Sequence, residues 1–132
     1  MKRIFYLCLV LGLAAPVMAE TSKGGDVKPI YYGLVPALVG NYGSSGKLKY
    51  YKADVALRIG SSVAEERVRH HEPLIRNQLV MLFSQQTEQS LGSVEAKEAL
   101  RQEALRQVQA VLNQEEGQPL VDDLLFNNLI IQ

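Results

Sequence analysis

The sequence predicts an α+β fold in which two helices pack on a mainly antiparallel sheet. Three observations lead to this prediction: a strand with alternating apolar residues over 51–59, an apolar helix over 73–85, and an amphipathic helix between Ser93 and Gly117. The chain has 132 residues, of which 47% are hydrophobic, so it can form one core but not two comfortable ones. We therefore expect a single folded domain over residues 30–132.

Residues 1–19 are typical of a secretory signal peptide. A short basic head ending at Arg3 precedes an apolar run, and Val17 and Ala19 are compact enough for the −3 and −1 positions of a cleavage site. The run from Ile4 to Ala19 would form a helix of about 24 Å, against about 30 Å of membrane hydrocarbon. Cleavage after Ala19 is therefore expected; the alternative is a short membrane anchor that is retained.

Cys8 is the only cysteine of the chain, and it lies inside this apolar run. It follows Arg3 too closely to be a lipid attachment site, and a chain cut after Ala19 would contain no disulfide. Residues 20–29 contain two glycines and few apolar side chains, so we expect a flexible lead before the domain.

Two strands are expected at the start of the domain. Ordered structure should begin at residues 30–34, and residues 37–42 predict a first full strand that a glycine-rich turn connects to the strand at 51–59. One face of the second strand is apolar and the other carries charge, so we expect a hairpin with one face on the core. The apolar face consists of Tyr51, Ala53, Val55, Leu57 and Ile59.

The next segment predicts a polar helix followed by an apolar one. Ser62 and Glu65 fit a capping box at the start of a solvated helix over 63–71. The apolar helix over 73–85 begins with a proline, and whether it continues the first helix with a kink or stands alone is open. Its core stripe is formed by Ile75, Leu79, Leu82 and Phe83, and Leu74, Val80 and Met81 are expected to widen it.

The last two elements are an amphipathic helix and a strand. Ser93 fits an N-cap and Gly117 a C-terminal stop. The apolar stripe is Leu100, Ala104, Leu105, Val108, Val111 and Leu112, with Lys97, Glu98, Arg101, Gln102 and Arg106 facing outward. In the strand over 120–132, alternation places Leu124, Phe126 and Ile130 on one face and Leu125, Leu129 and Ile131 on the other. Apolar residues on both faces predict a strand inside the sheet.

Charge and candidate ligands give no support for nucleic-acid or metal chemistry. Fourteen basic residues balance 14 acidic ones, whereas a nucleic-acid partner calls for clustered cations. His70 and His71 point about 100° apart on a helix, with Glu72 as their only neighbouring ligand type, so a solvated pair is favoured over a metal site. Asp122 and Asp123 could contribute to a cation site, but the favoured interpretation is that they mark the solvent-exposed start of a strand.

No set of residues predicts catalysis. Ser44 and Ser45 lie in the glycine turn without a basic helper, and Ser84 and Thr87 fit polar helix terminators. The sequence therefore predicts no enzyme, with no catalytic, cofactor-binding or metal residue. Five tyrosines gather near the hairpin, and strand packing is favoured over an interaction surface for them: Tyr31, Tyr32, Tyr42, Tyr50 and Tyr51.

Three blocks of the chain resemble the flagellar basal-body-associated FliL family. The first joins the strand at 48–59 to the helix that starts Pro73-Leu74-Ile75-Arg76-Asn77 and runs to Thr87. The second is Leu91 to Lys97 with Leu100-Arg101, where Ala96 replaces the usual glycine of the family. The third is the closing strand, Val121 to Gln132. Together the blocks cover residues 48–132.

The resemblance implies a periplasmic domain similar to the stomatin/prohibitin-type (SPFH-like) fold, without catalysis or cofactor. It implies a homo-oligomer that contacts flagellar stator and basal-body proteins and supports motility. Family members usually carry a full transmembrane helix, whereas this chain begins with a run that looks cleavable. We therefore expect a periplasmic scaffold, with anchoring or peripheral association at the inner membrane as the alternative location. The alternative function is a soluble periplasmic binding module for a small ligand or peptide.

Overall fold

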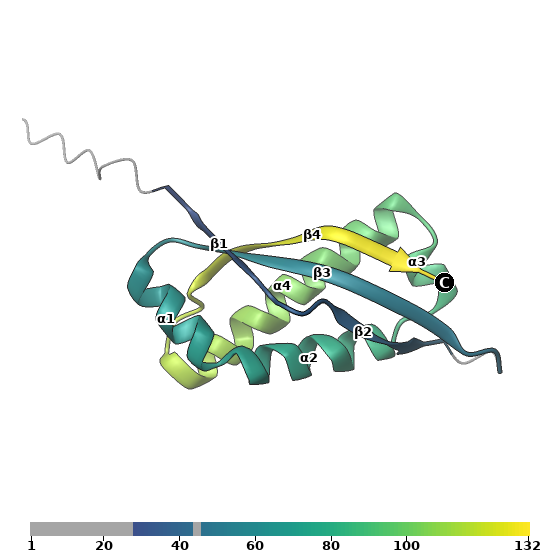
Figure 1. Ribbon diagram of the computed structural model, residues 1–132, viewed down its shortest axis with the longest axis horizontal. Coiled ribbons are helices and arrows are strands. Elements are labelled where there is room, and N and C mark those ends of the chain that lie inside the picture. The colour runs from purple at the N-terminus through teal and green to yellow at the C-terminus, as the bar shows by residue number, and fades with distance from the viewer. Residues whose placement is uncertain (1–27, 44–45) are drawn as a thin grey trace, which may run out of the picture.

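A four-stranded antiparallel sheet with helices packed on it forms the domain (Figure 1). The computed structural model describes residues 28–43 and 46–132, so the predictions for residues 1–19 and for most of 20–29 lie outside it. The strands are β1 (Ile30–Gly33), β2 (Leu38–Tyr42), β3 (Lys49–Ile59) and β4 (Val121–Ile131). The helices are α1 (Ser62–His70), α2 (Glu72–Ser84), α3 (Glu88–Leu91) and α4 (Val94–Glu116). The α+β prediction is confirmed: α1, α2 and α4 correspond to the three predicted helical segments, and the short helix α3 is additional.

Strand β3 is the centre of the sheet. Its first half pairs with β2, where Leu38 lies opposite Ala53, which confirms the predicted hairpin. Its second half pairs with β1 along the same side, and β4 pairs along the whole of the other side. The prediction that the last strand lies inside the sheet is therefore wrong: within the described residues, β4 pairs with β3 alone and forms an edge (Figure 1).

Two bulges in β4 correct the predicted alternation of its faces. Along β3, the β4 partner jumps from Asn128 to Phe126 between Asp54 and Val55, and a second shift follows between Arg58 and Ile59. The extra residues bring β4 apolar side chains to the core side at five positions. In order, Val121, Leu124, Phe126, Leu129 and Ile131 lie opposite Ile59, Leu57, Val55, Ala53 and Tyr51.

The apolar residues expected on two faces of β4 thus lie mostly on one. Phe126, Leu129 and Ile131 pack against the buried core, and Leu124 is completely buried. Ile130 is 39% exposed on the other face, because the bulge before Asn128 reverses the alternation. Strict alternation fails here because a bulge adds one residue to one strand only.

The polar and apolar helical segments form two helices that meet at His71. Ser61, and not Ser62, caps α1: its backbone is extended, and its hydroxyl accepts a 3.1 Å bond from the Ala64 N–H. The predicted capping box with Glu65 is therefore wrong by one position. Val68 is the single buried residue of α1, in agreement with the predicted solvated helix.

Helix α2 buries the predicted stripe of Ile75, Leu79, Leu82 and Phe83. The expected widening of this stripe is wrong. Leu74, Val80 and Met81 are between 37% and 48% exposed, because the neighbouring strand β2 and helix α4 cover only one side of α2. Among the described residues, no helix is both long and apolar enough to cross a membrane.

Helix α4 has the predicted boundaries. The Ser93 hydroxyl accepts a 3.0 Å bond from the Ala96 N–H, and Gly117 takes the left-handed conformation with φ 73°. Leu100, Ala104, Val108 and Leu112 are buried. The helix therefore lies on the sheet with its stripe inward, as expected.

Candidate functional site

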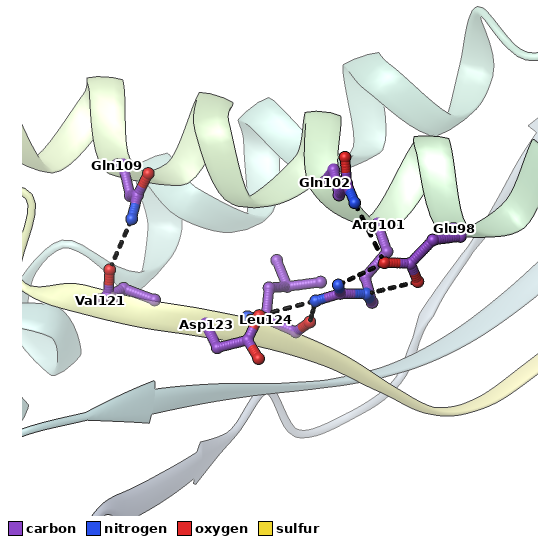
Figure 2. A network of polar contacts seen from close by, with 7 residues as sticks. All are labelled: Glu98, Arg101, Gln102, Gln109, Val121, Asp123 and Leu124. Carbon is purple, nitrogen blue, oxygen red and sulfur yellow. Dashed lines mark hydrogen bonds and ion pairs between the residues drawn. The ribbon is translucent and has the colours of Figure 1, made fainter.

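Arg101 joins helix α4 to the edge strand β4 (Figure 2). Its guanidinium donates a 2.6 Å bond to Asp123 Oδ1 and a 3.0 Å bond to the Leu124 carbonyl, and it also binds both carboxylate oxygens of Glu98. The prediction that Arg101 faces outward is therefore wrong. The hydrogen bond from Arg101 lowers the pKa of the Glu98 carboxyl to about 2. The carboxylates of Glu98 and Asp123 raise the pKa of Arg101.

A second side chain of α4 contacts the same strand. The Gln109 side-chain amide donates a 2.9 Å bond to the Val121 carbonyl (Figure 2). Together Arg101 and Gln109 occupy backbone acceptors at the beginning of β4, at the edge where another strand could otherwise pair. We call these two side chains the edge guard.

The acidic pair at this end of β4 has divided roles. Asp123 accepts from Arg101 and from the Leu124 N–H, whereas Asp122 is exposed. Within residues 28–43 and 46–132, no group of three or more His, Cys, Asp or Glu side chains could hold a metal ion. Asp123 therefore has a positioning role between helix and strand.

His71 is held in a polar cluster at the opposite end of α4. Its Nε2 lies 2.6 Å from Glu116 Oε1, and its side chain is only 11% exposed, which corrects the expectation of a solvated pair for this residue. His70 is exposed, with its ring edge-on to that of His71. The contact with His71 is the main reason why the pKa of the Glu116 carboxyl is lowered, and Arg67 adds to it. The cluster ties the α1–α2 junction to the end of α4.

Tyr32 fastens strand β1 to the start of α2. Its hydroxyl donates to a Glu72 carboxylate oxygen, and the Arg69 guanidinium lies 5.6 Å from its ring centre. Burial, followed by the Glu72 contact, raises the pKa of Tyr32. Arg76 approaches Glu72 to 3.9 Å from the next helical turn. Glu72, considered as a metal ligand from the sequence, thus serves a structural contact.

Tyr51 covers a glycine on the neighbouring strand. Gly40 lies opposite Tyr51, and a Cβ added to Gly40 would stand 2.6 Å from the tyrosine hydroxyl. The Tyr51 ring packs 5.2 Å from that of Phe83, and burial raises the pKa of its hydroxyl. That hydroxyl is buried, and no hydrogen-bond partner for it occurs among the described residues.

The five tyrosines are divided between core and surface. Tyr42 and Tyr51 are buried and Tyr32 is half-buried, so the packing interpretation is confirmed for these three. Tyr31 and Tyr50 are 56% and 47% exposed. Tyr50 borders an open hollow of about 310 Å³, whose other lining residues are Val39, Tyr51, Lys52, Ile130 and Gln132.

The serine and threonine candidates have local structural roles where the structure describes them. Ser84 donates to the Met81 carbonyl at 2.8 Å, and Thr87 caps α3 in a capping box with Ser90. Ser44 and Ser45 lie outside the described residues. The remaining candidate for function is therefore surface: the hollow near Tyr50 and the adjoining edge of β4.

A small domain of this kind, whose polar clusters join its own elements and whose open features are a sheet face and a strand edge, fits a class of proteins that act by contact. The family model for "Flagellar basal body-associated protein FliL" matches residues 31–132. The chain belongs to this FliL family, which is a family of flagellar accessory proteins and not of enzymes. The sequence-based recognition is thereby confirmed.

A curated relative supports the same assignment. The flagellar protein FliL of Aquifex aeolicus (strain VF5) is 25% identical over 118 residues, which cover 89% of this chain and 68% of that protein. The three blocks that carried the resemblance meet in the fold. The first and third pair as β3 and β4, and the second and third meet at Arg101 and Asp123.

Sequence reasoning missed both the Arg101 network and the contact between Tyr32 and Glu72. A signal for the first was present, since Arg101 directly follows Leu100 at the flank of the apolar stripe. No comparable signal exists for Tyr32 and Glu72, which are 40 residues apart.

Proposed function

We propose that this protein is a non-enzymatic periplasmic scaffold of the flagellar basal body, which supports motility by self-association and by contact with stator components. The observation that carries the proposal is the family match over residues 31–132. The surface agrees with such a role, because Tyr31, Val39, Tyr50 and Ile130 expose apolar area of the sheet. Such area on a small domain favours protein contacts over a deep ligand site.

The alternative of a small-ligand binding module has less support. The hollow at Tyr50 has about 310 Å³ and the one at Tyr42 about 340 Å³, both near the lower bound of ligand pockets, and both are open to solvent. A ligand there would keep much of its surface in water. A contact surface fits these hollows better.

Export by a cleaved signal peptide over residues 1–19 is part of the proposal. Cleavage after Ala19 would leave the lead over 20–29 and the domain over 30–132 in the periplasm. Intact mass together with fractionation of the native host tests this. A periplasmic species beginning at Glu20 supports export and cleavage, whereas a full-length species in the inner-membrane fraction indicates the anchored alternative.

The stator role is tested by motility. Deletion of the gene should reduce swimming and swarming, and expression of the full chain should restore them. Unchanged motility in both assays would reject the proposed role. The likeness to the stomatin/prohibitin-type fold stays a prediction, which superposition of the described domain on such a fold tests.

A further inference from the structure

The edge of β4 is guarded along its first part and open along its last. Gln109 and Arg101 bind the carbonyls of Val121 and Leu124. In the described part of the chain, no side chain hydrogen-bonds the backbone of residues 125–131. Natural proteins protect an edge with charges, prolines or covering groups, because an open edge pairs with other strands. The last third of β4 lacks this protection.

The backbone groups that face outward can be assigned from the pairing with β3. Tyr50 and Gln132 exchange two 2.8 Å backbone bonds, so this pair is hydrogen-bonded. In an antiparallel ladder such pairs alternate with pairs whose N–H and C=O groups point away. The pairs without hydrogen bonds between their backbones are therefore Ile131 with Tyr51 and Leu129 with Ala53. Their backbone groups therefore point to the open edge.

The side chains at this edge are complementary to themselves. Residues 124–132 contain no charged residue and no proline, and the last five read Asn128-Leu129-Ile130-Ile131-Gln132. The order is amide, aliphatic, aliphatic, aliphatic, amide, which is the same in both directions. Two antiparallel copies centred on Ile130 would set amide against amide and aliphatic against aliphatic. No like charges would meet at the symmetry axis.

We propose that the open end of β4 pairs with β4 of a second copy, antiparallel and with a two-fold axis at Ile130. In each copy, the N–H and C=O of Leu129 would hydrogen-bond the C=O and N–H of Ile131 in the other copy. The two Ile130 side chains would meet on the helix-free face of the sheet. The backbone N–H and C=O groups of Leu129 and Ile131 point to the open edge, which fits this register. The contact deepens the self-association in the proposed function and rests on it.

The occupant is a second copy because symmetry places each residue opposite its chemical equal. A foreign strand would need no such palindrome. The contact is isologous, so it closes as a dimer and gives no open fibre. Because only five residues on each side pair, the area is below that of a standard stable interface, and the isolated protein should dimerise weakly, with a Kd on the order of micromolar to millimolar.

Cross-linking tests the register with a matched pair of cysteines in a Cys8→Ser full chain. At the axis the two Ile130→Cys side chains would have Cβ atoms about 4.5–5.5 Å apart, close enough for a disulfide under mild oxidation. Asn128→Cys lies on the same face of the same strand, but the two copies would be about 13 Å apart there, since four residues separate them along the strand. We expect a disulfide dimer from the first variant and monomer from the second. Equal cross-linking of both variants, or of neither, overturns the pairing.

A charge at the axis gives a second measurement. Ile130→Lys would bring two ammonium groups together, so we expect the dimer Kd from sedimentation equilibrium to rise at least tenfold. Leu74→Lys is the control, because Leu74 is 45% exposed, against 39% for Ile130, but lies on helix α2 and not on the sheet. It should leave Kd unchanged. An oligomer unaffected by Ile130→Lys overturns this contact without touching the motor role, which the deletion assay decides.

Discussion

Arg101 on α4 and Asp123 on β4 are 22 residues apart in sequence and are joined by a 2.6 Å charge-assisted hydrogen bond. The same guanidinium occupies the Leu124 carbonyl. One side chain thus holds the long helix on the sheet and blocks part of the strand edge. Both partners are partly shielded, with side chains 23% and 27% exposed, so this ion pair should contribute more than a surface pair.

Replacement of Arg101 by Ala should destabilise the domain. The variant loses the bonds to β4 and leaves Asp123 without its cation, so the free energy of unfolding should fall by about 1–3 kcal/mol. Urea unfolding followed by circular dichroism measures this. Arg106→Ala is the control: Arg106 pairs with Glu103 on the same helix but is 74% exposed, and its loss should cost less than about 0.5 kcal/mol. Equal losses in the two variants would contradict the special role of Arg101.

Stability should decrease in acid through the carboxyls of α4. The fold lowers the pKa of Glu98 from 4.5 to about 2, so its contribution is fully present above pH about 4.5 and is lost as the pH falls toward about 2. Glu98→Gln should flatten the acid limb of a plot of urea midpoint against pH. Glu115→Gln, an exposed residue of the same helix, should leave it steep. About 0.5 M salt should weaken the Glu98 effect, because this side chain is 49% exposed.

Gly40 should not tolerate a side chain. In Gly40→Ala the new Cβ would stand 2.6 Å from the Tyr51 hydroxyl and 2.9 Å from ring carbons, so strand or ring must shift. We expect a loss of about 1–3 kcal/mol in thermal or urea unfolding. Gly46→Ala is an imperfect control for space: no atom of the described residues lies within 4 Å of the added Cβ, but the φ of 77° at Gly46 is itself unfavourable. Gly33→Ala, with only a 4.0 Å contact, is the better match and should cost less.

The hydroxyl of Tyr51 gives a separate expectation. It is buried without a partner among the described residues, so Tyr51→Phe should leave stability unchanged or raise it by up to about 1 kcal/mol. Phe keeps the contact with Phe83. A loss of more than 1 kcal/mol in urea unfolding would mean that the hydroxyl does have a stabilising partner.

Helix α2 offers a test of which apolar residues form the core. Leu79→Ala should cost about 2–5 kcal/mol, because Leu79 is completely buried and leaves a cavity. Met81→Ala, two positions on and 48% exposed, should change the free energy of unfolding by less than about 0.5 kcal/mol. Both are measured by urea unfolding. A large loss from Met81→Ala would restore the wider core stripe expected from the sequence.

Sequence patterns predicted the elements whose signals are local. The hairpin strands, the buried stripe of α2, and the caps of α4 at Ser93 and Gly117 depend on periodicity and on side-chain bonds within one turn. The same reasoning failed at Leu74 and Met81. Hydrophobicity shows that a side chain can be buried, but only the neighbouring elements decide whether something covers it.

The candidate site shows the same difference between local signals and contacts that depend on the tertiary structure. Family membership was recognisable from three short blocks, because their residues and order are properties of the chain. The contact between the second and third blocks at Arg101 and Asp123 could not be predicted, since α4 must first dock on the sheet to bring the two side chains together.

By itself the sequence determined the fold class, the family and most of the helix and strand positions, because these arise from short-range patterns. Only the tertiary structure decided that β4 is an edge strand and that its bulges turn the side chains of Leu129 and Ile131 toward the core. It also decided that the outer backbone groups of the last β4 residues have no partner among the described residues. Strand order and register depend on contacts between distant segments. The sum of those contacts, and no single segment, fixes which pairing buries the most apolar surface.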